Sequence, residues 1–174
     1  MNGTAAYRCY ISLGANLGQR EQNLCEALQR LGQLQHTSLE VVSSFYETAP
    51  WGRTAQPAFL NAAALLRTSL EPVQLLLLCQ GIEQALGRQR KEKWGPRTID
   101  IDLLHVPGYH LESTRLMLPH PYLLKRAFVL VPLAEIAPDE NFAGRTFQSW
   151  CEACEDKKSV QKILFTGRNF LRKS

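Results

Sequence analysis

Two hydrophobic periodicities alternate along the chain, and their order constrains the fold more than any other feature of the sequence. Alternating runs rich in β-branched and aromatic residues predict strands, and apolar residues at spacings of three and four predict helices. The strand patterns cover residues 7–13, 39–48, 59–68 and 99–106, and the helical patterns cover residues 24–31 and 72–87. This order predicts an α+β fold with a ferredoxin-like βαββαβ antiparallel sheet. Its helices would pack on one face and leave the other face available for a site.

Extra C-terminal elements are expected after these six. Residues 107–118 resemble a short hairpin that begins at a Pro-Gly turn, and residues 129–136 are apolar enough for a buried helix, which Pro138 would end. A last helix is predicted near residues 146–155, before an apolar and basic tail.

The chain of 174 residues is long enough for one domain that buries about two-thirds of its unfolded surface. We expect this domain to span residues 1–156, and residues 157–174 to form a basic C-terminal tail that can pack on it. The tail holds six lysines and arginines and no acid, so removing this +6 from the net charge of +4 leaves the domain at −2. The pI of 8.9 therefore reflects the tail and is weak evidence for nucleic-acid binding.

No apolar run approaches the ~20 residues of a membrane-spanning helix, and residues 1–8 lack the apolar core of a signal peptide. A cytoplasmic location without a membrane partner is therefore expected. The five cysteines are an odd number, which favours reduced thiols. Residues 150–154 match the W-C-x-x-C outline of thioredoxin-like sites, but they lie late, in a predicted helix with two glutamates. No second Cys or His pair completes a zinc site, so we disfavour the redox and zinc interpretations.

Residues 88–102 join a cationic stretch to a strand that carries two carboxylates. The cations are Arg88, Arg90, Lys91, Lys93 and Arg97, against one acid, Glu92. Alternation places Asp100 and Asp102 on one face of the strand, with their bases roughly 7 Å apart. This suits two divalent cations, which prefer oxygen ligands and can lie ~3.5–4 Å apart. Alone, a basic run is usually a solvated surface and D-x-D the polar side of a sheet, but together they predict a polyphosphate site.

At three other positions, the sequence allows a structural and a functional interpretation of the side chain. Trp51, in the proline-containing loop 49–57, is either a packing anchor or a lid over a flat ligand. Asn61 lies among apolar residues and either hydrogen-bonds in the core or faces a ligand. His120, between two prolines, is either a structural hydrogen-bonding group or a catalyst. The turn at residues 14–18 matches neither G-x-x-x-x-G-K-[ST] nor G-x-G-x-x-G, so we interpret it as structural.

Several segments together resemble one known family. They read Y-I-S-L-G-A-N-L-G, S-S-F-Y-E-T-A-P-W-G, Q-P-A-F-L-N-A-A, L-G-R-Q-R-K-E-K-W-G-P-R-T-I-D-I-D-L-L and L-P-H-P, in this order within residues 7–138. The family is 6-hydroxymethyl-7,8-dihydropterin pyrophosphokinase of the folate pathway, and W-G-P-R-T-I-D-I-D is the most specific segment. The resemblance implies a ferredoxin-like α/β fold and transfer of the terminal two phosphates of ATP to the hydroxymethyl group of the pterin, with release of AMP.

The same resemblance implies roles for individual residues. Asp100 and Asp102 match the ligands of two Mg²⁺ ions, and Arg88 and Arg97 match arginines of a catalytic loop. The ATP contacts would be Gln80, Glu83, Arg88, Arg90, Trp94, Arg97, Leu103, Arg115, Met117, His120 and Arg126. The pterin contacts would be Thr48, Ala49, Trp51, Phe59, Asn61, Trp94 and Phe128, with Phe59 and Phe128 as a stacking pair. Members of the family vary at the positions of Trp51, Phe59 and Met117, and the chain departs from the common pattern after about residue 155.

A ferredoxin-like RNA-binding module is the alternative from another class, suggested by the fold and the basic tail. However, two aspartates on a sheet strand would repel a phosphate backbone unless metal is bound, and the R-G-F-x-F-V-x-F outline is absent. We therefore expect a diphosphotransferase that uses ATP as co-substrate and Mg²⁺ as cofactor, acts on the pterin and binds no nucleic acid.

Overall fold

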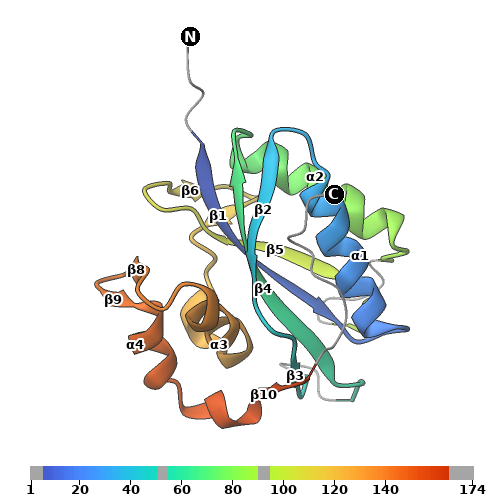
Figure 1. Ribbon diagram of the computed structural model, residues 1–174, viewed down its shortest axis with the longest axis vertical. Helices are drawn as coiled ribbons and strands as arrows, with labels where there is room; N and C mark the ends of the chain where they lie inside the picture. Colours follow the sequence, from blue (N-terminus) through green and yellow to red (C-terminus); the bar gives the residue numbers. More distant parts are fainter. Residues whose placement is uncertain (1–5, 51–54, 90–94, 165–174) are drawn as a thin grey trace.

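The computed structural model describes residues 6–50, 55–89 and 95–164. A six-stranded sheet lies at its centre in the order β10-β3-β4-β1-β5, and β2 also pairs with β4 (Figure 1). The strands are β1 (Tyr7–Ala15), β2 (Thr37–Val42), β3 (Tyr46–Thr48), β4 (Phe59–Thr68), β5 (Asp100–His105) and β10 (Gln161–Lys162). Every pairing is antiparallel, as the sequence predicts.

The helices α1 (Arg20–Gly32) and α2 (Pro72–Ala85) cover one face of this sheet (Figure 1). The apolar stripe of α1 is fully buried in the core that both helices form with the strands. Pro72 opens α2 at the position that proline favours, because its missing N–H would have no partner there. Gly87 follows the helix with a φ of +82°, a conformation that glycine adopts without steric cost. Both signals were readable in the sequence, and the two helices are confirmed.

On the other face of the sheet, α3 (Ala127–Ile136) packs against β4, and α4 (Phe147–Glu152) packs against α3 (Figure 1). Here Tyr10, Ala63, Leu65 and Leu104 form a second core with α3 and with Phe147. The prediction that the helices of the βαββαβ unit pack on one face is confirmed for α1 and α2, whereas the additional helices cover part of the face that was expected to stay open. The central strands carry apolar residues on both faces, so both faces must be covered to remove this surface from water.

The strand predicted at residues 39–48 is interrupted and forms β2 and β3, which both pair with β4. Ser43 lies at the interruption, where its N–H donates to the Ala63 carbonyl at 2.9 Å. Its Oγ accepts from the Ala63 N–H, also at 2.9 Å. A side-chain oxygen thus replaces a backbone carbonyl in the ladder, so the strand can bend without leaving Ala63 unsatisfied.

The remaining elements follow β5. They are the hairpin of β6 (Leu111–Glu112) with β7 (Met117–Leu118), the 3₁₀ helix η1 (Leu123–Lys125), the hairpin of β8 (Asn141–Phe142) with β9 (Arg145–Thr146) and the 3₁₀ helix η2 (Glu155–Ser159). The first hairpin was predicted, and α4 ends earlier than the predicted helix. The described start of the tail joins the sheet, since β10 pairs with β3 and Lys162 Nζ lies 3.4 Å from Glu135 Oε1. Across the described ranges, no helix has the length and apolar character needed to span a membrane.

Candidate active site

Two cavities share a wall beside β5. The larger has a volume of about 630 Å³ and lies between α2, β5 and residues 113–126. The smaller, of about 70 Å³, lies between the strands β1, β3 and β4 and Phe128. Arg97, Asp100, Asp102 and Arg126 line both cavities. A ligand in one cavity would therefore meet a ligand in the other at four charged side chains.

The two aspartates reach this shared wall because of the alternation of β5. Ile101 and Leu103 pack in the core and are 3% and 2% exposed, and Asp100 and Asp102, on the opposite face of the strand, line both cavities. The strand places Asp100 opposite Gly14 and Asp102 opposite Ser12 of β1. The predicted arrangement, with both carboxylates on one face, is confirmed.

Gly14 allows two side chains of β4 to lie close over β1. A Cβ atom at this position would be 3.0 Å from Asn61 Oδ1 and 3.7 Å from Phe59 Cδ1. Any larger residue would push against the carboxamide that lines the smaller cavity, so glycine is required by this close approach. This gives a definite reason for one glycine of the turn that we interpreted as structural.

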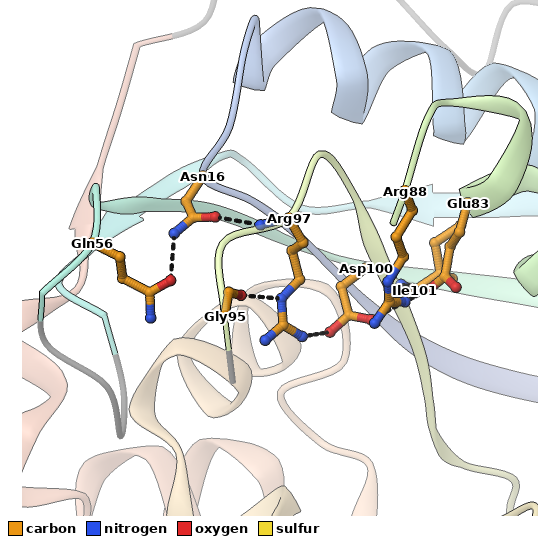
Figure 2. A network of polar contacts seen from close by, with 8 residues as sticks. All are labelled: Asn16, Gln56, Glu83, Arg88, Gly95, Arg97, Asp100 and Ile101. Atoms are coloured by element: carbon orange, nitrogen blue, oxygen red, sulfur yellow. Dashed lines mark hydrogen bonds and ion pairs between the residues drawn. The ribbon is translucent and has the colours of Figure 1, made fainter. Parts of the chain in front are cut away.

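Two arginines are held by a single aspartate (Figure 2). Arg88 Nη1 lies 2.6 Å from Asp100 Oδ1, and Arg97 Nη1 lies 2.5 Å from Asp100 Oδ2. Arg88 Nη1 is also 2.5 Å from Glu83 Oε1, and this same oxygen accepts from the Ile101 N–H at 2.7 Å. Burial raises the pKa of Glu83 above its usual range, and its bonds to Ile101 and Arg88 work in the opposite direction. Both guanidinium groups therefore point at the shared wall, where a phosphate would meet them.

The negative charge of Asp102 is less well compensated by neighbouring cations than that of Asp100. Burial, together with the negative charges of Asp100 and Glu83, raises the pKa of Asp102 to about 7. The positive charges of Arg126 and Arg97 offset only part of this effect. A carboxylate that is crowded by like charges is stabilised in its ionised form by a bound cation.

A divalent cation fits this pair of aspartates. Within residues 6–50, 55–89 and 95–164, no group of three or more His, Cys, Asp or Glu side chains could hold a metal ion. Mg²⁺ usually binds through one or two carboxylates and completes its shell with waters and substrate phosphates. Asp100 and Asp102 provide this donor set, so the cation would be shared with a phosphate ligand.

The larger cavity brings together the residues that were expected to contact ATP. Those that the structure describes all line it, namely Gln80, Glu83, Arg88, Arg97, Leu103, Arg115, Met117, His120 and Arg126. Arg90 and Trp94 lie outside the described residues. Because these nine come from α2, the segment between α2 and β5, β5 itself, the β6–β7 hairpin and the segment before α3, only the fold brings them together.

His120 has a backbone and a side-chain contact that fix its place in the larger cavity. Its N–H donates to the Leu104 carbonyl at 2.7 Å, and its Nδ1 accepts from the Tyr122 N–H at 3.1 Å. Burial, and to a lesser extent the charge of Arg126, lowers the pKa of His120 to about 4. The imidazole is therefore neutral near pH 7, and with Nδ1 accepting, its Nε2 carries the hydrogen and can donate to a ligand.

The smaller cavity collects the described residues that were expected to contact the pterin. These are Thr48, Ala49, Phe59, Asn61 and Phe128. Asn61 Nδ2 donates to Thr48 Oγ1 at 2.7 Å, so Asn61 is hydrogen-bonded and also lines the cavity. Trp51 and Trp94 lie outside the described residues.

The W-C-x-x-C segment has no sign of redox chemistry. Cys151 and Cys154 are free thiols, and burial raises the pKa of both. For Cys154, a hydrogen bond to Asp156 adds to this effect and the pKa reaches about 11. Reactive cysteines have lowered thiol pKa values, so the structure agrees with our rejection of the redox interpretation.

The sequence reasoning missed Asn16, which lies in the turn after β1 and is 3% exposed. Its side chain contacts Gln56 on one side and the backbone of Arg97 on the other (Figure 2). It also donates a hydrogen bond to the Pro57 carbonyl. The available signal was an amide residue directly after an apolar strand, where a buried carboxamide needs partners on both of its atoms. Ser12 and Leu13, which also line the smaller cavity, were missed as well.

Comparisons with known proteins agree with the geometry. The family model described as 7,8-dihydro-6-hydroxymethylpterin-pyrophosphokinase (HPPK) matches residues 10–138. A 2-amino-4-hydroxy-6-hydroxymethyldihydropteridine pyrophosphokinase of Methylorubrum extorquens is 48% identical over 139 residues, which are 80% of this chain and 88% of the relative. The protein of the same name from Bacillus subtilis (strain 168) is 42% identical over 158 residues, which are 89% of this chain and 95% of the relative.

Solved structures share the fold at much lower sequence identity. HPPK-DHPS of Plasmodium falciparum, crystallised with pterin and p-hydroxybenzoate, matches with a TM-score of 0.70 and 14% identity. The match covers 91% of this chain but 45% of that longer chain, so the likeness concerns the fold of less than half of it. The family match and the two relatives extend over most of the sequence. The chain therefore belongs to the 7,8-dihydro-6-hydroxymethylpterin-pyrophosphokinase family.

Proposed function

We propose that this chain transfers the pyrophosphate group of ATP to the hydroxymethyl group of 6-hydroxymethyl-7,8-dihydropterin, giving the pterin diphosphate and AMP in tetrahydrofolate biosynthesis. The observation that carries the proposal is the meeting of two cavities at Arg97, Asp100 and Asp102, with Arg88 beside them. The relatives, which are named for this pyrophosphokinase activity, support the choice of substrates.

In the proposed reaction, the hydroxymethyl oxygen forms a bond to the β-phosphorus of ATP. The bond between this phosphorus and the oxygen that bridges to the α-phosphate breaks, and AMP leaves with that oxygen. The hydroxyl proton is released to solvent. Because the transferred charge is spread over phosphate oxygens, positioning and positive charge supply most of the catalysis.

The arginines would change partners when ATP enters the larger cavity. Arg88 and Arg97 are bound to Asp100, and phosphate oxygens offer the same planar pair of acceptors as a carboxylate. Asp100 and Asp102 would then be free to hold Mg²⁺, which neutralises phosphate charge and lowers the pKa of the attacking hydroxyl. Glu83 stays bound to the Ile101 N–H and so keeps Arg88 directed at the phosphates.

The pterin is proposed to occupy the smaller cavity between Phe59 and Phe128, with Asn61 and Thr48 as polar contacts. At about 70 Å³, this cavity is well below the ~300 Å³ of a typical ligand pocket. Its walls must therefore move apart when the bicyclic ring enters. Arg97, whose guanidinium lies 5.8 Å above the ring of Phe59, would follow this movement at the phosphate side.

The experiment that tests the proposal identifies the nucleotide product. The chain is incubated with ATP, Mg²⁺ and the reduced pterin, and the nucleotides are separated by ion-exchange chromatography. We expect AMP in equal amount to the pterin diphosphate, and no AMP when the pterin is omitted. ADP as the product would mean transfer of the γ-phosphoryl group alone and would overturn the proposal.

We also propose the finer structural and cellular assignments. The ferredoxin-like topology is supported by the order of the strands when β2 and β3 count as one interrupted strand. The domain at residues 1–156, the tail at residues 157–174, the cytoplasmic location and the absence of a nucleic-acid partner stay predictions from the sequence. The family match gives no support to the RNA-binding alternative.

A further inference from the structure

Asn16 connects Gln56 to Arg97, which is one of the residues of the shared wall (Figure 2). Its Nδ2 donates to Gln56 Oε1 at 3.0 Å and to the Pro57 carbonyl at 3.1 Å. Its Oδ1 accepts from the Arg97 N–H at 2.9 Å. The N–H groups of Asn16 and Leu17 donate to the Arg97 carbonyl at 3.1 and 3.2 Å. Both the amide and the carbonyl of Arg97 are therefore held by the turn between β1 and α1.

The chemistry of the partners fixes the orientation of the Asn16 carboxamide. The carbonyl of Pro57 can only accept a hydrogen bond, and the N–H of Arg97 can only donate one. The nitrogen of Asn16 must therefore face Pro57 and its oxygen must face Arg97. Aspartate, which has the same shape, can serve Arg97 but cannot donate to Pro57.

The two connected segments lead to opposite sides of the site. On one side, residues 56–58 run directly into β4 at Phe59, which lines the smaller cavity. On the other side, the Arg97 guanidinium contacts Asp100, while its Nε donates to the Gly95 carbonyl at 3.2 Å. Asn16 itself lines neither cavity, so it would act through these neighbours.

We infer that Asn16 is a positioning residue, whose carboxamide couples the segment before Phe59 to the backbone of Arg97. The coupling assembles the pterin side and the phosphate side of the site together. This inference rests on the proposed function and adds a residue that contacts neither substrate. The Nδ2 atom of Asn16 binds the segment before Phe59, and its Oδ1 atom binds the Arg97 N–H. Mutations can therefore remove one of these two contacts and keep the other.

Two variants of Asn16 separate the halves. Asn16→Asp keeps the acceptor for Arg97 and loses the donor for Gln56 and Pro57, so we expect KM for the pterin to rise at least about fivefold, with a smaller change in kcat. Asn16→Ala loses both, so kcat should also fall on the order of tenfold to a hundredfold, because Arg97 is no longer held in place.

The matched control is Asn23→Ala, because Asn23 Nδ2 donates to the Leu17 and Thr98 carbonyls at 3.1 and 3.0 Å. It removes an amide from the same region without touching Arg97 or residues 56–57, and kcat and both KM values should stay within about twofold of wild type. Equal losses in Asn23→Ala and Asn16→Ala would overturn the inference. So would kinetics of Asn16→Ala within about twofold of wild type.

A second readout does not depend on activity. In the unliganded protein, amide exchange at Arg97 should be faster in Asn16→Ala and unchanged in Asn16→Asp, because only the first variant removes its acceptor. An unchanged rate in Asn16→Ala would overturn the inference. If Asn16→Ala does not fold, the isosteric Asn16→Asp decides through its KM for the pterin. Wild-type protein that makes no AMP would instead reject the proposed function, and the exchange measurement would still test the coupling.

Discussion

At the scale of single residues, the two aspartates of β5 lie in opposite electrostatic situations. Asp100 binds both Arg88 and Arg97, so its charge is compensated in the protein itself. Asp102 is crowded by Asp100 and Glu83, and its raised pKa reflects this. The proposed exchange of partners on ATP binding would therefore centre on Asp100, whereas Asp102 would accept a cation without losing an existing partner of comparable strength.

Removing the Arg97 side chain should affect turnover more than binding. In Arg97→Ala the backbone contacts with Asn16 and Leu17 remain, so the segment stays in place and only the guanidinium is lost. We expect kcat to fall on the order of 10²- to 10³-fold, because this cation acts on charge that develops in the transition state. The Kd for ATP, measured by calorimetry, should change by less than about tenfold.

The control for this variant is Arg67→Ala, since Arg67 forms an exposed ion pair with Glu40 on the far part of β4. Its loss should leave kcat and the Kd for ATP unchanged, as exposed pairs contribute little. An Arg97→Ala protein with wild-type kcat would refute the role assigned to Arg97.

The sequence could identify residues that share a local pattern and could not identify those joined only by the fold. Asp100 and Asp102 follow from the alternation of one strand, and their placement was predicted correctly. Asn16 has partners 40 and 81 residues away, so its position after an apolar strand indicates that a buried carboxamide needs partners but not which residues they are. Asn61 is hydrogen-bonded and also lines a cavity. Its apolar neighbours in the sequence could not show that both interpretations hold together.

At the scale of elements, the end of α2 directs Arg88 into the site. The helix stops at Ala85, and Gly87 turns the chain with a positive φ immediately before Arg88. Glu83, a buried residue in the last turn of the helix, then forms an ion pair with Arg88. The helix and its termination signal thus determine where one of the two arginines proposed to bind phosphate lies.

Two glycine substitutions at α2 should change stability in opposite directions. A Cβ at either Gly81 or Gly87 would meet no atom within 4 Å, so neither substitution causes a clash. Gly87→Ala forces alanine into a left-handed conformation, which should lower the free energy of unfolding by about 1–2 kcal/mol. Gly81→Ala lies inside the helix and should raise it by about 0.5–1 kcal/mol.

Urea denaturation of both variants beside wild type measures these differences. Because Gly87 directly precedes Arg88, the Gly87→Ala substitution should also displace Arg88 and lower kcat. The kcat of Gly81→Ala should not change. Equal stability of the two variants would show that the conformation at Gly87 carries no cost.

The elements themselves were largely readable from the sequence, and their packing was not. Periodicity located β1, β4, β5, α1 and α2, and proline and glycine marked the limits of α2. It could not show that Ser43 interrupts one strand, because this depends on a hydrogen bond to Ala63 across the sheet. It also could not show that α3 covers the face opposite α1 and α2, since a single apolar helix gives no indication of which side of a sheet it will cover.

At the scale of the whole molecule, the site reduces the stability of the protein that contains it. Three carboxylates, Glu83, Asp100 and Asp102, face one another, and burial raises the pKa of two of them. In the absence of a cation, the folded state must hold this negative charge together, whereas the unfolded chain separates it. Such a cost is expected where a site is arranged for a charged ligand.

Replacing Asp102 by asparagine should therefore stabilise the metal-free protein while it inactivates the enzyme. Between pH 4 and 7, folded Asp102 retains a proton that the unfolded chain releases, so wild-type stability decreases as pH rises and the loss is complete above about pH 7. Asp102→Asn lacks this loss and should be more stable at pH 8 by about 1–3 kcal/mol, as measured by urea denaturation with a chelator present. Its kcat should fall on the order of 10³-fold.

Asp139→Asn removes an exposed charge instead and should keep the wild-type pH profile. Parallel pH profiles for wild type and Asp102→Asn would show that the charge of Asp102 does not oppose folding.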